Sequence, residues 1–172
     1  DTGNQRIDAY SPEGVFLFGI GPKVGNYNLQ EPVALAWDKA GFLYFVDKGL
    51  KKVFKVEPSG AFLAAGGEEG GGPGQFKNPV SLAFDGQNYV YTLDAELKRV
   101  SVYTKAGKWM TDFFAGGKQE HDLTEPVAVA VQADVLLIAD KGKNRISSYA
   151  LHPTLAAQTA ISSSTKEGIV TL

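Results

Sequence analysis

The sequence predicts an all-β fold built from repeated four-stranded antiparallel units. Segments PVALAWD, PVSLAFD and PVAVAV begin at Pro32, Pro79 and Pro126, so a repeat of 47 residues runs through the chain. Glycine supplies 20 of the 172 residues, which is typical of many tight turns. No segment places apolar residues at helical spacing, so we expect almost no helix.

Each unit reads as four short strands, named a to d in chain order. Strand a is expected at 32–38, 79–85 and 126–131, and strand b at 42–47, 89–94 and 134–140. Strand c is expected at 6–10, 53–57, 99–104 and 145–150, and strand d at 15–19, 61–66 and 108–114. The a–b and c–d connections carry Asp, Gly and, in two copies, Pro, which favour tight turns. The glycine-rich run 66–76 is expected to be a flexible connection from strand d to the next strand a.

An aspartate ends each strand b, at Asp47, Asp94 and Asp140, and Asp1 matches this position one unit earlier. A carboxylate at a strand end can accept hydrogen bonds from the amides of the following turn. Recurrence in every unit favours this structural role over a metal site.

Strand a alternates large and small side chains, and strand b is apolar at nearly every position. Such a sheet must be covered on both faces. Four-stranded units of this length that stack face to face are the blades of a β-propeller. We therefore expect Trp37 and Phe84, on the large-residue face of strand a, to be buried between adjacent blades.

These recurring columns resemble the NHL repeat family. The matching features are a glycine-rich loop, an aromatic residue or Leu, Pro-Val, an apolar strand, the strand-end Asp and a basic turn before strand c. The resemblance covers about three and a half repeats, and it implies an NHL-type propeller over residues 1–160 with a linker or tail at 161–172. The family serves many roles, so the resemblance implies no single function.

The expected strands do not close a ring. The first unit has only strands c and d, two units are complete, and the last lacks a clear strand d. A propeller needs about four to eight blades. We expect blades that precede residue 1, or a second chain, to complete the ring.

Three residues before the Pro of strand a, Glu31, Asn78 and Glu125, should surround the mouth of the propeller's central channel. Two carboxylates and an amide oxygen are suitable ligands for calcium. The alternative is that a residue before Pro is simply extended and solvated. Calcium-dependent propeller lactonases, which this architecture resembles distantly, make a metal-dependent hydrolase or lyase the second functional hypothesis.

The b–c turns gather basic residues on one rim of the disc. The candidate binding residues are Arg6, Lys51, Lys52, Lys98, Arg99, Lys143 and Arg145. Some NHL domains bind single-stranded RNA on this rim, which makes RNA binding a third hypothesis. Acidic residues interrupt these turns and no aromatic residue lies among them for base stacking, so we expect no nucleic-acid partner.

Composition limits the function further. With no cysteine and only two histidines, the chain has no disulfide framework, zinc–thiolate site or cysteine nucleophile. No apolar run is long enough to span a bilayer, and the polar residues that begin at residue 1 do not have the pattern of a secretory signal. The sequence does not identify the cellular compartment, although it slightly favours an extracytoplasmic or secreted location. The sequence favours a non-catalytic scaffold that docks a protein, peptide or glycan. Such a scaffold requires no cofactor, whereas the alternative hydrolase or lyase would bind calcium.

Overall fold

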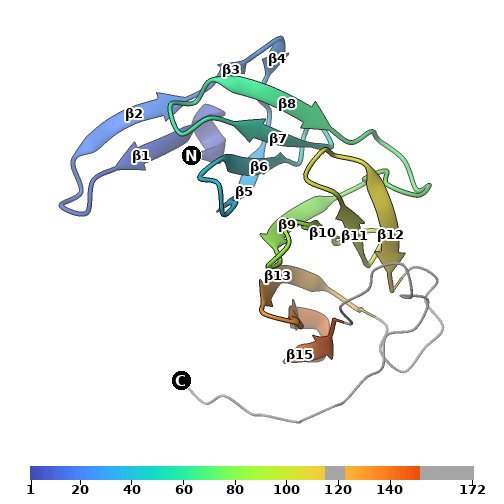
Figure 1. Ribbon diagram of the computed structural model, residues 1–172. Helices are drawn as coiled ribbons and strands as arrows, with labels where there is room; N and C mark the ends of the chain where they lie inside the picture. The colour runs from blue at the N-terminus through green and yellow to red at the C-terminus, as the bar shows by residue number, and fades with distance from the viewer. Residues whose placement is uncertain (115–122, 152–172) are drawn as a thin grey trace.

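The computed structural model describes residues 1–114 and 123–151, and these residues form an arc of β-sheets (Figure 1). Three of the sheets are stacked units in the order expected from the repeat, and the only helical segments in this part of the chain are two short 3-10 turns. No helix among the described residues is long and apolar enough to cross a membrane. The predicted tail at 161–172 and the boundary at residue 160 lie outside these residues.

The N-terminal part is a half blade. After the 3-10 turn η1 (Thr2–Asn4), strands β1 (Ile7–Tyr10) and β2 (Phe16–Ile20) pair antiparallel with each other. A small hairpin of β3 (Lys23–Val24) and β4 (Tyr27–Asn28) follows. Strands β1 and β2 match the expected strands c and d, whereas the hairpin was not expected.

Two complete blades and a three-stranded blade follow. Blade I consists of β5 (Pro32–Trp37), β6 (Leu43–Asp47), β7 (Lys52–Val56) and β8 (Phe62–Gly66), hydrogen-bonded in that order. Blade II consists of β9 (Pro79–Phe84), β10 (Val90–Asp94), β11 (Arg99–Tyr103) and β12 (Trp109–Phe113). Blade III consists of β13 (Pro126–Gln132), β14 (Val135–Asp140), the 3-10 turn η2 (Lys141–Lys143) and β15 (Arg145–Ala150). The all-β fold, the antiparallel blades and the incomplete ring are therefore confirmed.

The core lies between blades rather than inside any one sheet. Strand β6 shows why, because Phe45 packs with the half blade while the next residue, Val46, packs with blade II. Both side chains are fully buried. The alternation of side chains along a strand sends consecutive apolar residues to opposite faces, so one strand stabilises two interfaces.

Most large residues of strand a face the preceding blade, and the small ones face the following blade. Val80 is an exception: it lies where the β9–β10 register shifts and packs with the cluster shared by blades II and III. Leu82 of β9 is buried against Tyr44 of blade I, and Ala34 and Ala36 of β5 pack into the same cluster. Val129 of β13 is likewise buried in the cluster shared by blades II and III. The small residues let neighbouring sheets approach closely.

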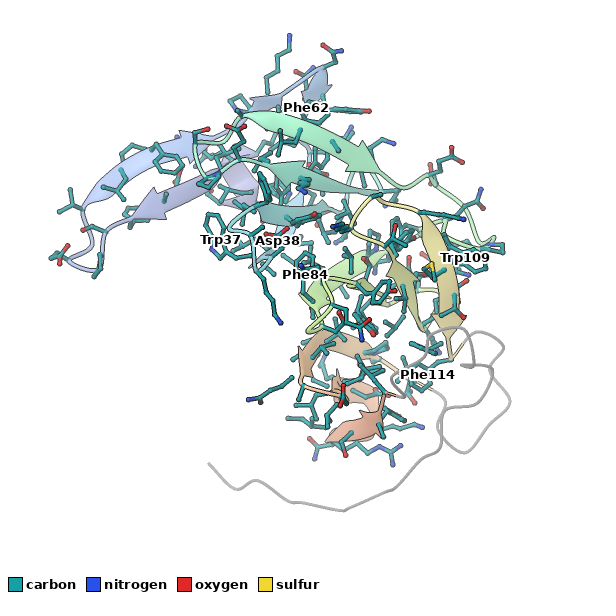
Figure 2. All side chains as sticks on the ribbon, in the orientation of Figure 1. Trp37, Asp38, Phe62, Phe84, Trp109 and Phe114 are labelled. Carbon is teal, nitrogen blue, oxygen red and sulfur yellow. The ribbon has the colours of Figure 1, made fainter. Side chains whose placement is uncertain are left out.

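The expected burial of Trp37 is wrong, because its side chain is 53% exposed. Phe84 is half-buried and its ring lies 4.8 Å from that of Tyr44, between blades I and II. Figure 2 shows Trp37 on the side of blade I that faces the half blade. The half blade contains β1 and β2 only, so no strands a and b cover Leu35 and Trp37 there.

Because Trp37 is exposed, its truncation should cost little. We expect Trp37→Ala to lower the free energy of unfolding by less than about 1.5 kcal/mol, whereas Phe45→Ala, which empties a buried site, should cost about 3–5 kcal/mol. Urea unfolding of the two variants measures both values. Equal losses would show that Trp37 is covered in solution.

Candidate functional site

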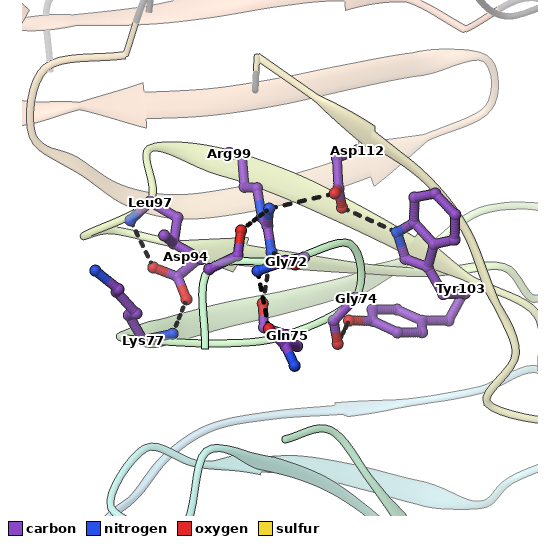
Figure 3. Close-up of polar contacts among 11 residues, drawn as sticks. Gly72, Gly74, Gln75, Lys77, Asp94, Leu97, Arg99, Tyr103 and Asp112 are labelled. Carbon is purple, nitrogen blue, oxygen red and sulfur yellow. Dashed lines mark hydrogen bonds and ion pairs between the residues drawn. The ribbon is translucent and has the colours of Figure 1, made fainter. Parts of the chain in front are cut away.

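Each b–c turn is organised around the aspartate that ends strand b. Asp94 is completely buried, and its Oδ1 accepts hydrogen bonds from the amides of Glu96 (3.0 Å) and Leu97 (2.8 Å). Its Oδ2 accepts from the amides of Lys77 (2.7 Å) and Asn78 (3.0 Å), which precede strand a of the same blade (Figure 3). The carboxylate thus ties the start of β9 to the end of β10.

The same arrangement recurs at Asp47 and Asp140. Asp47 accepts from the amides of Gln30, Glu31 and Leu50 at 2.8 to 3.0 Å. Asp140 accepts from the amides of Thr124 and Glu125, both at 2.8 Å. The structural role expected for these aspartates is confirmed, although most of these hydrogen bonds come from a segment about 16 residues earlier in the chain rather than from the following turn.

These bonds also set the acidity of Asp140. Burial alone would raise its pKa, but backbone hydrogen bonds from Glu125, Thr124 and Lys143, helped by the Lys143 charge, hold the pKa below its usual value. The ionised form is therefore bound more tightly by the folded chain than by the unfolded chain.

Because the pKa of Asp140 is lower in the folded state, the free energy of unfolding depends on pH in a defined direction. The stabilising effect of Asp140 is complete above the usual aspartate pKa of about 3.9 and is lost as the pH falls through the lower folded value. We expect the stability difference between the parent and Asp140→Asn to shrink as the pH falls below about 4. Urea titrations of both proteins from neutral to acidic pH measure it, and a difference that grows toward acid would contradict the account.

The three channel-mouth candidates occupy equivalent places in blades I, II and III. The backbone carbonyls of Glu31, Asn78 and Glu125 accept from the first amide after each strand-end aspartate, at 2.8, 2.9 and 3.0 Å. The carboxylate of Glu31 lies 2.6 Å from the ammonium of Lys48, and that of Glu125 lies 2.9 Å from Lys141. Each glutamate is therefore paired with a lysine of its own blade.

The amide side chain of Asn78 differs from the two glutamates. Its Oδ1 is buried, and within residues 1–114 and 123–151 it has no hydrogen-bond partner. The described residues contain no group of three or more His, Cys, Asp or Glu side chains placed to hold a metal ion. Calcium binding at the three candidates remains a hypothesis.

We expect calcium to leave the melting temperature of the chain unchanged. Calcium prefers six to eight oxygen ligands, whereas blades I and III each offer one carboxylate with an ammonium group beside it and blade II offers the amide of Asn78. Thermal unfolding with and without millimolar CaCl2 tests this. A saturable rise in melting temperature that Glu31→Gln abolishes would instead support the calcium hypothesis.

The candidate rim cations fall into two groups. Arg6 pairs with Asp8 at 3.0 Å, while Lys51 and Lys52 donate to the carbonyl oxygens of Lys48 (2.9 Å) and Gly67 (2.8 Å). Lys98 and Arg145 are exposed, and neither side chain has a hydrogen bond or ion pair within the part of the chain that the structure describes. Lys143 is half-exposed beside Asp140. The freely presented charge thus belongs to blades II and III.

Arg99 is not a rim residue. Its side chain is buried, and its guanidinium pairs with Asp112 at 3.3 Å on the same sheet. It also donates to the carbonyl oxygens of Gly71 (3.2 Å), Gly72 (2.6 Å) and Gln75 (2.6 Å), as Figure 3 shows for part of the set. The expectation that Arg99 contacts a partner on the rim is corrected: its donors hold the glycine-rich loop.

The same loop was expected to be a flexible connection. It does join β8 to β9, but the Tyr103 hydroxyl donates to the carbonyl oxygen of Gly74 at 2.9 Å, and the amide of Gly72 donates to Oε1 of Gln75 at 2.9 Å. With Arg99, these contacts fix the loop on blade II. Sequence reasoning missed Tyr103, which lies on the same strand as Arg99, and Asp112, which lies on the neighbouring strand β12. Their places on these strands are the only signal.

No family model matches the chain, and no curated protein matches it. The structure is similar to a catalytically inactive virginiamycin B lyase from Staphylococcus aureus with quinupristin, with a TM-score of 0.68 and 15% identity over 94% of this chain and 49% of that one. It is also similar to a chain of the nidogen/laminin complex, with a TM-score of 0.67 and 20% identity over 88% of this chain and 53% of the other.

A third similar structure is that of the RRP9 WD40 repeats, with a TM-score of 0.59 and 16% identity over 86% of this chain and 45% of the other. All three neighbours are β-propeller proteins, so the chain has a propeller-type fold. It spans about half the length of these neighbours. At these identities the likeness concerns the fold alone.

Proposed function

We propose that this chain supplies NHL-type propeller blades that act as a non-catalytic scaffold, and that the rim of blades II and III docks an acidic segment of a protein partner. The pairing of charges on the rim carries the proposal. The aspartates at the ends of β6, β10 and β14 are bonded to backbone amides, and Glu31 and Glu125 are paired with lysines.

Because these acids are already bonded to amides or paired with lysines, they do not neutralise the remaining cations of the rim. Lys98 and Arg145 both lie at the start of strand c in neighbouring blades, and both are exposed. Arg145 is at the repeat position of Arg99, and Lys98 precedes that position by one residue. Cations on a rigid rim favour a partner that carries carboxylates. Neither b–c turn contains an aromatic residue, which disfavours single-stranded RNA.

One propeller neighbour is part of a protein complex, that of nidogen and laminin, and this supports a binding role for the fold. The resemblance to NHL repeats supports the same role, because a repeated blade presents equivalent turns along one surface. A metal-dependent lyase reaction has no comparable support, since the channel-mouth carboxylates are neutralised by Lys48 and Lys141.

The experiment measures fluorescence anisotropy of a labelled Glu/Asp-rich peptide, its Gln/Asn counterpart and a single-stranded RNA of equal charge. We expect the acidic peptide to bind most tightly and the double variant Lys98→Glu/Arg145→Glu to weaken it at least about tenfold. The matched control is Lys108→Glu, which changes an exposed lysine at the opposite end of blade II. Equal weakening by the control would reject the rim site, and tighter binding of the RNA would support the nucleic-acid hypothesis instead.

A further inference from the structure

A cavity of about 460 Å³ lies between blades I and II, beside the last strand of blade I. Its walls are β7 and β8 of blade I and, in blade II, the end of β11 with the turn at 104–107. Most of the lining is apolar and includes Leu63, Phe76 and Val90. This volume lies within the range of ligand-binding pockets.

The cavity is open because the c–d turn of blade II does not rest on blade I. Gly60 and Gly107 close the c–d turns of blades I and II at the same place in the repeat. A Cβ atom added to Gly60 would lie 2.9 Å from the Ile20 side chain, so the turn of blade I packs against the half blade. A Cβ atom added to Gly107 would meet no other atom within 4 Å. The turn of blade II therefore stands clear of β8.

The strand beside the cavity has a free edge. Strand β8 is the last strand of its sheet, and among the described residues its backbone pairs with β7 alone. Its sequence, FLAAG, lacks the charged residues and proline that usually protect such an edge, and Phe62 and Leu63 are exposed. The cavity lining includes every residue from 63 to 67, so it follows the edge of the strand and not only one face. An edge of this kind can accept an added strand.

The charges around the cavity have one sign. Lys55 and Lys105 lie on its two walls, and none of the lining residues is acidic. The ammonium of Lys55 lies 4.2 Å from the centre of the Phe42 ring, and neither lysine has an ion pair within residues 1–114 and 123–151. Unpaired cations beside an apolar cavity favour an occupant that carries both carboxylates and apolar side chains.

We propose that the cavity and the edge of β8 form a docking groove for an extended peptide segment of a partner protein, in which apolar side chains are flanked by acidic residues. The segment adds a fifth strand to blade I, so that its backbone pairs with β8. Side chains on one face of the added strand enter the cavity, and the flanking carboxylates lie on the side of Lys55 and Lys105. This groove is separate from the rim of the b–c turns and does not depend on the scaffold proposal.

The test measures fluorescence anisotropy of the labelled peptide DDLVLDD. The full chain carries Lys98→Glu/Arg145→Glu, so that the rim does not take up the acidic probe. We expect saturable binding of DDLVLDD. Binding should be at least about tenfold weaker for DDSSSDD, which lacks the apolar side chains, and for KKLVLKK, which reverses the charge. Equal binding of the three peptides, or no saturable binding of DDLVLDD, would overturn the proposal.

Backbone methylation of the probe tests whether it adds as a strand. Two further peptides carry one N-methyl group each, on adjacent residues of the LVL core. Because only alternate amides of an added strand bond to the edge, we expect one methyl group to weaken binding at least about tenfold and the other to have a much smaller effect. Equal effects of the two methyl groups would overturn strand addition.

Variants of the edge locate the groove. Leu63→Glu places a carboxylate on the part of β8 that lines the cavity and should weaken DDLVLDD at least about tenfold. The matched control is Leu17→Glu, because Leu17 is the exposed residue at the corresponding bulge of β2 and does not line the cavity. Parent-like binding by Leu63→Glu, or equal weakening by both variants, would overturn the assignment.

Two more measurements test the charge and the identity of the occupant. Lys105→Glu should weaken DDLVLDD at least about fivefold, whereas Lys108→Glu, at an exposed lysine that does not line the cavity, should change its affinity less than about twofold. Equal effects of the two variants would overturn the role of Lys105. Sedimentation velocity should show no dimer that Leu63→Glu dissociates. Such a dimer would identify a second copy of the chain as the occupant and overturn the peptide proposal.

Discussion

Replacing Arg99 by Met is expected to lower the free energy of unfolding by about 3–5 kcal/mol, the usual loss when one partner of a buried ion pair is removed. Among the described residues, the change leaves the buried Asp112 carboxylate with the indole Nε1 of Trp109, at 3.0 Å, as its remaining partner. It also removes the donors of three loop carbonyls. Urea unfolding followed by tryptophan fluorescence measures the loss.

Two controls separate this network from general effects of charge. Lys98→Met alters the neighbouring exposed cation and should change stability by less than about 0.5 kcal/mol. The double variant Arg99→Met/Asp112→Leu removes both charges and should recover part of the loss, because no unpaired carboxylate remains. If Arg99→Met is no more costly than Lys98→Met, the guanidinium does not hold the loop in solution.

Replacing Asp94 by Ala should lower the free energy of unfolding by a similar amount, about 3–5 kcal/mol. The reason is that four backbone amides lose a buried charged acceptor. These amides belong to the start of β9 and to the β10–β11 turn, so we also expect faster hydrogen exchange at Lys77, Asn78 and Leu97. Exchange measured by NMR or mass spectrometry tests the local effect, and urea unfolding tests the global one.

The control for Asp94 is Glu96→Ala. Glu96 lies two residues away, is exposed, and pairs with Lys77 at 3.4 Å, so its loss should cost less than about 1 kcal/mol. A small effect of Asp94→Ala, or unchanged exchange in the flanking turns, would contradict the role of the carboxylate as the link between the two strands.

Much of the fold could be predicted from the sequence, because the signals are local and repeated. Pro32, Pro79 and Pro126 each begin a strand, and Asp47, Asp94 and Asp140 each end one, as the 47-residue period indicates. The β3–β4 hairpin lies outside the repeat, and its one local signal is the turn sequence Gly25-Asn26 between Val24 and Tyr27.

The candidate site was less predictable. Arg99 occupies the same repeat position as Lys52 and Arg145, so its sequence context alone indicates a solvated rim. Its burial depends on Asp112 and on a loop whose carbonyls lie 24 to 28 residues earlier in the chain. No local pattern carries that information, because the contacts form only when the loop folds back on blade II.

The sequence by itself determined the strands, their order and the residues that bind each blade together, because these follow from side-chain alternation, turn chemistry and a repeated carboxylate. Only the tertiary structure decided which surfaces are covered. Trp37 and Phe84 occupy equivalent positions, yet one is exposed and the other half-buried, because a residue between blades is buried only where a neighbouring sheet stands against it.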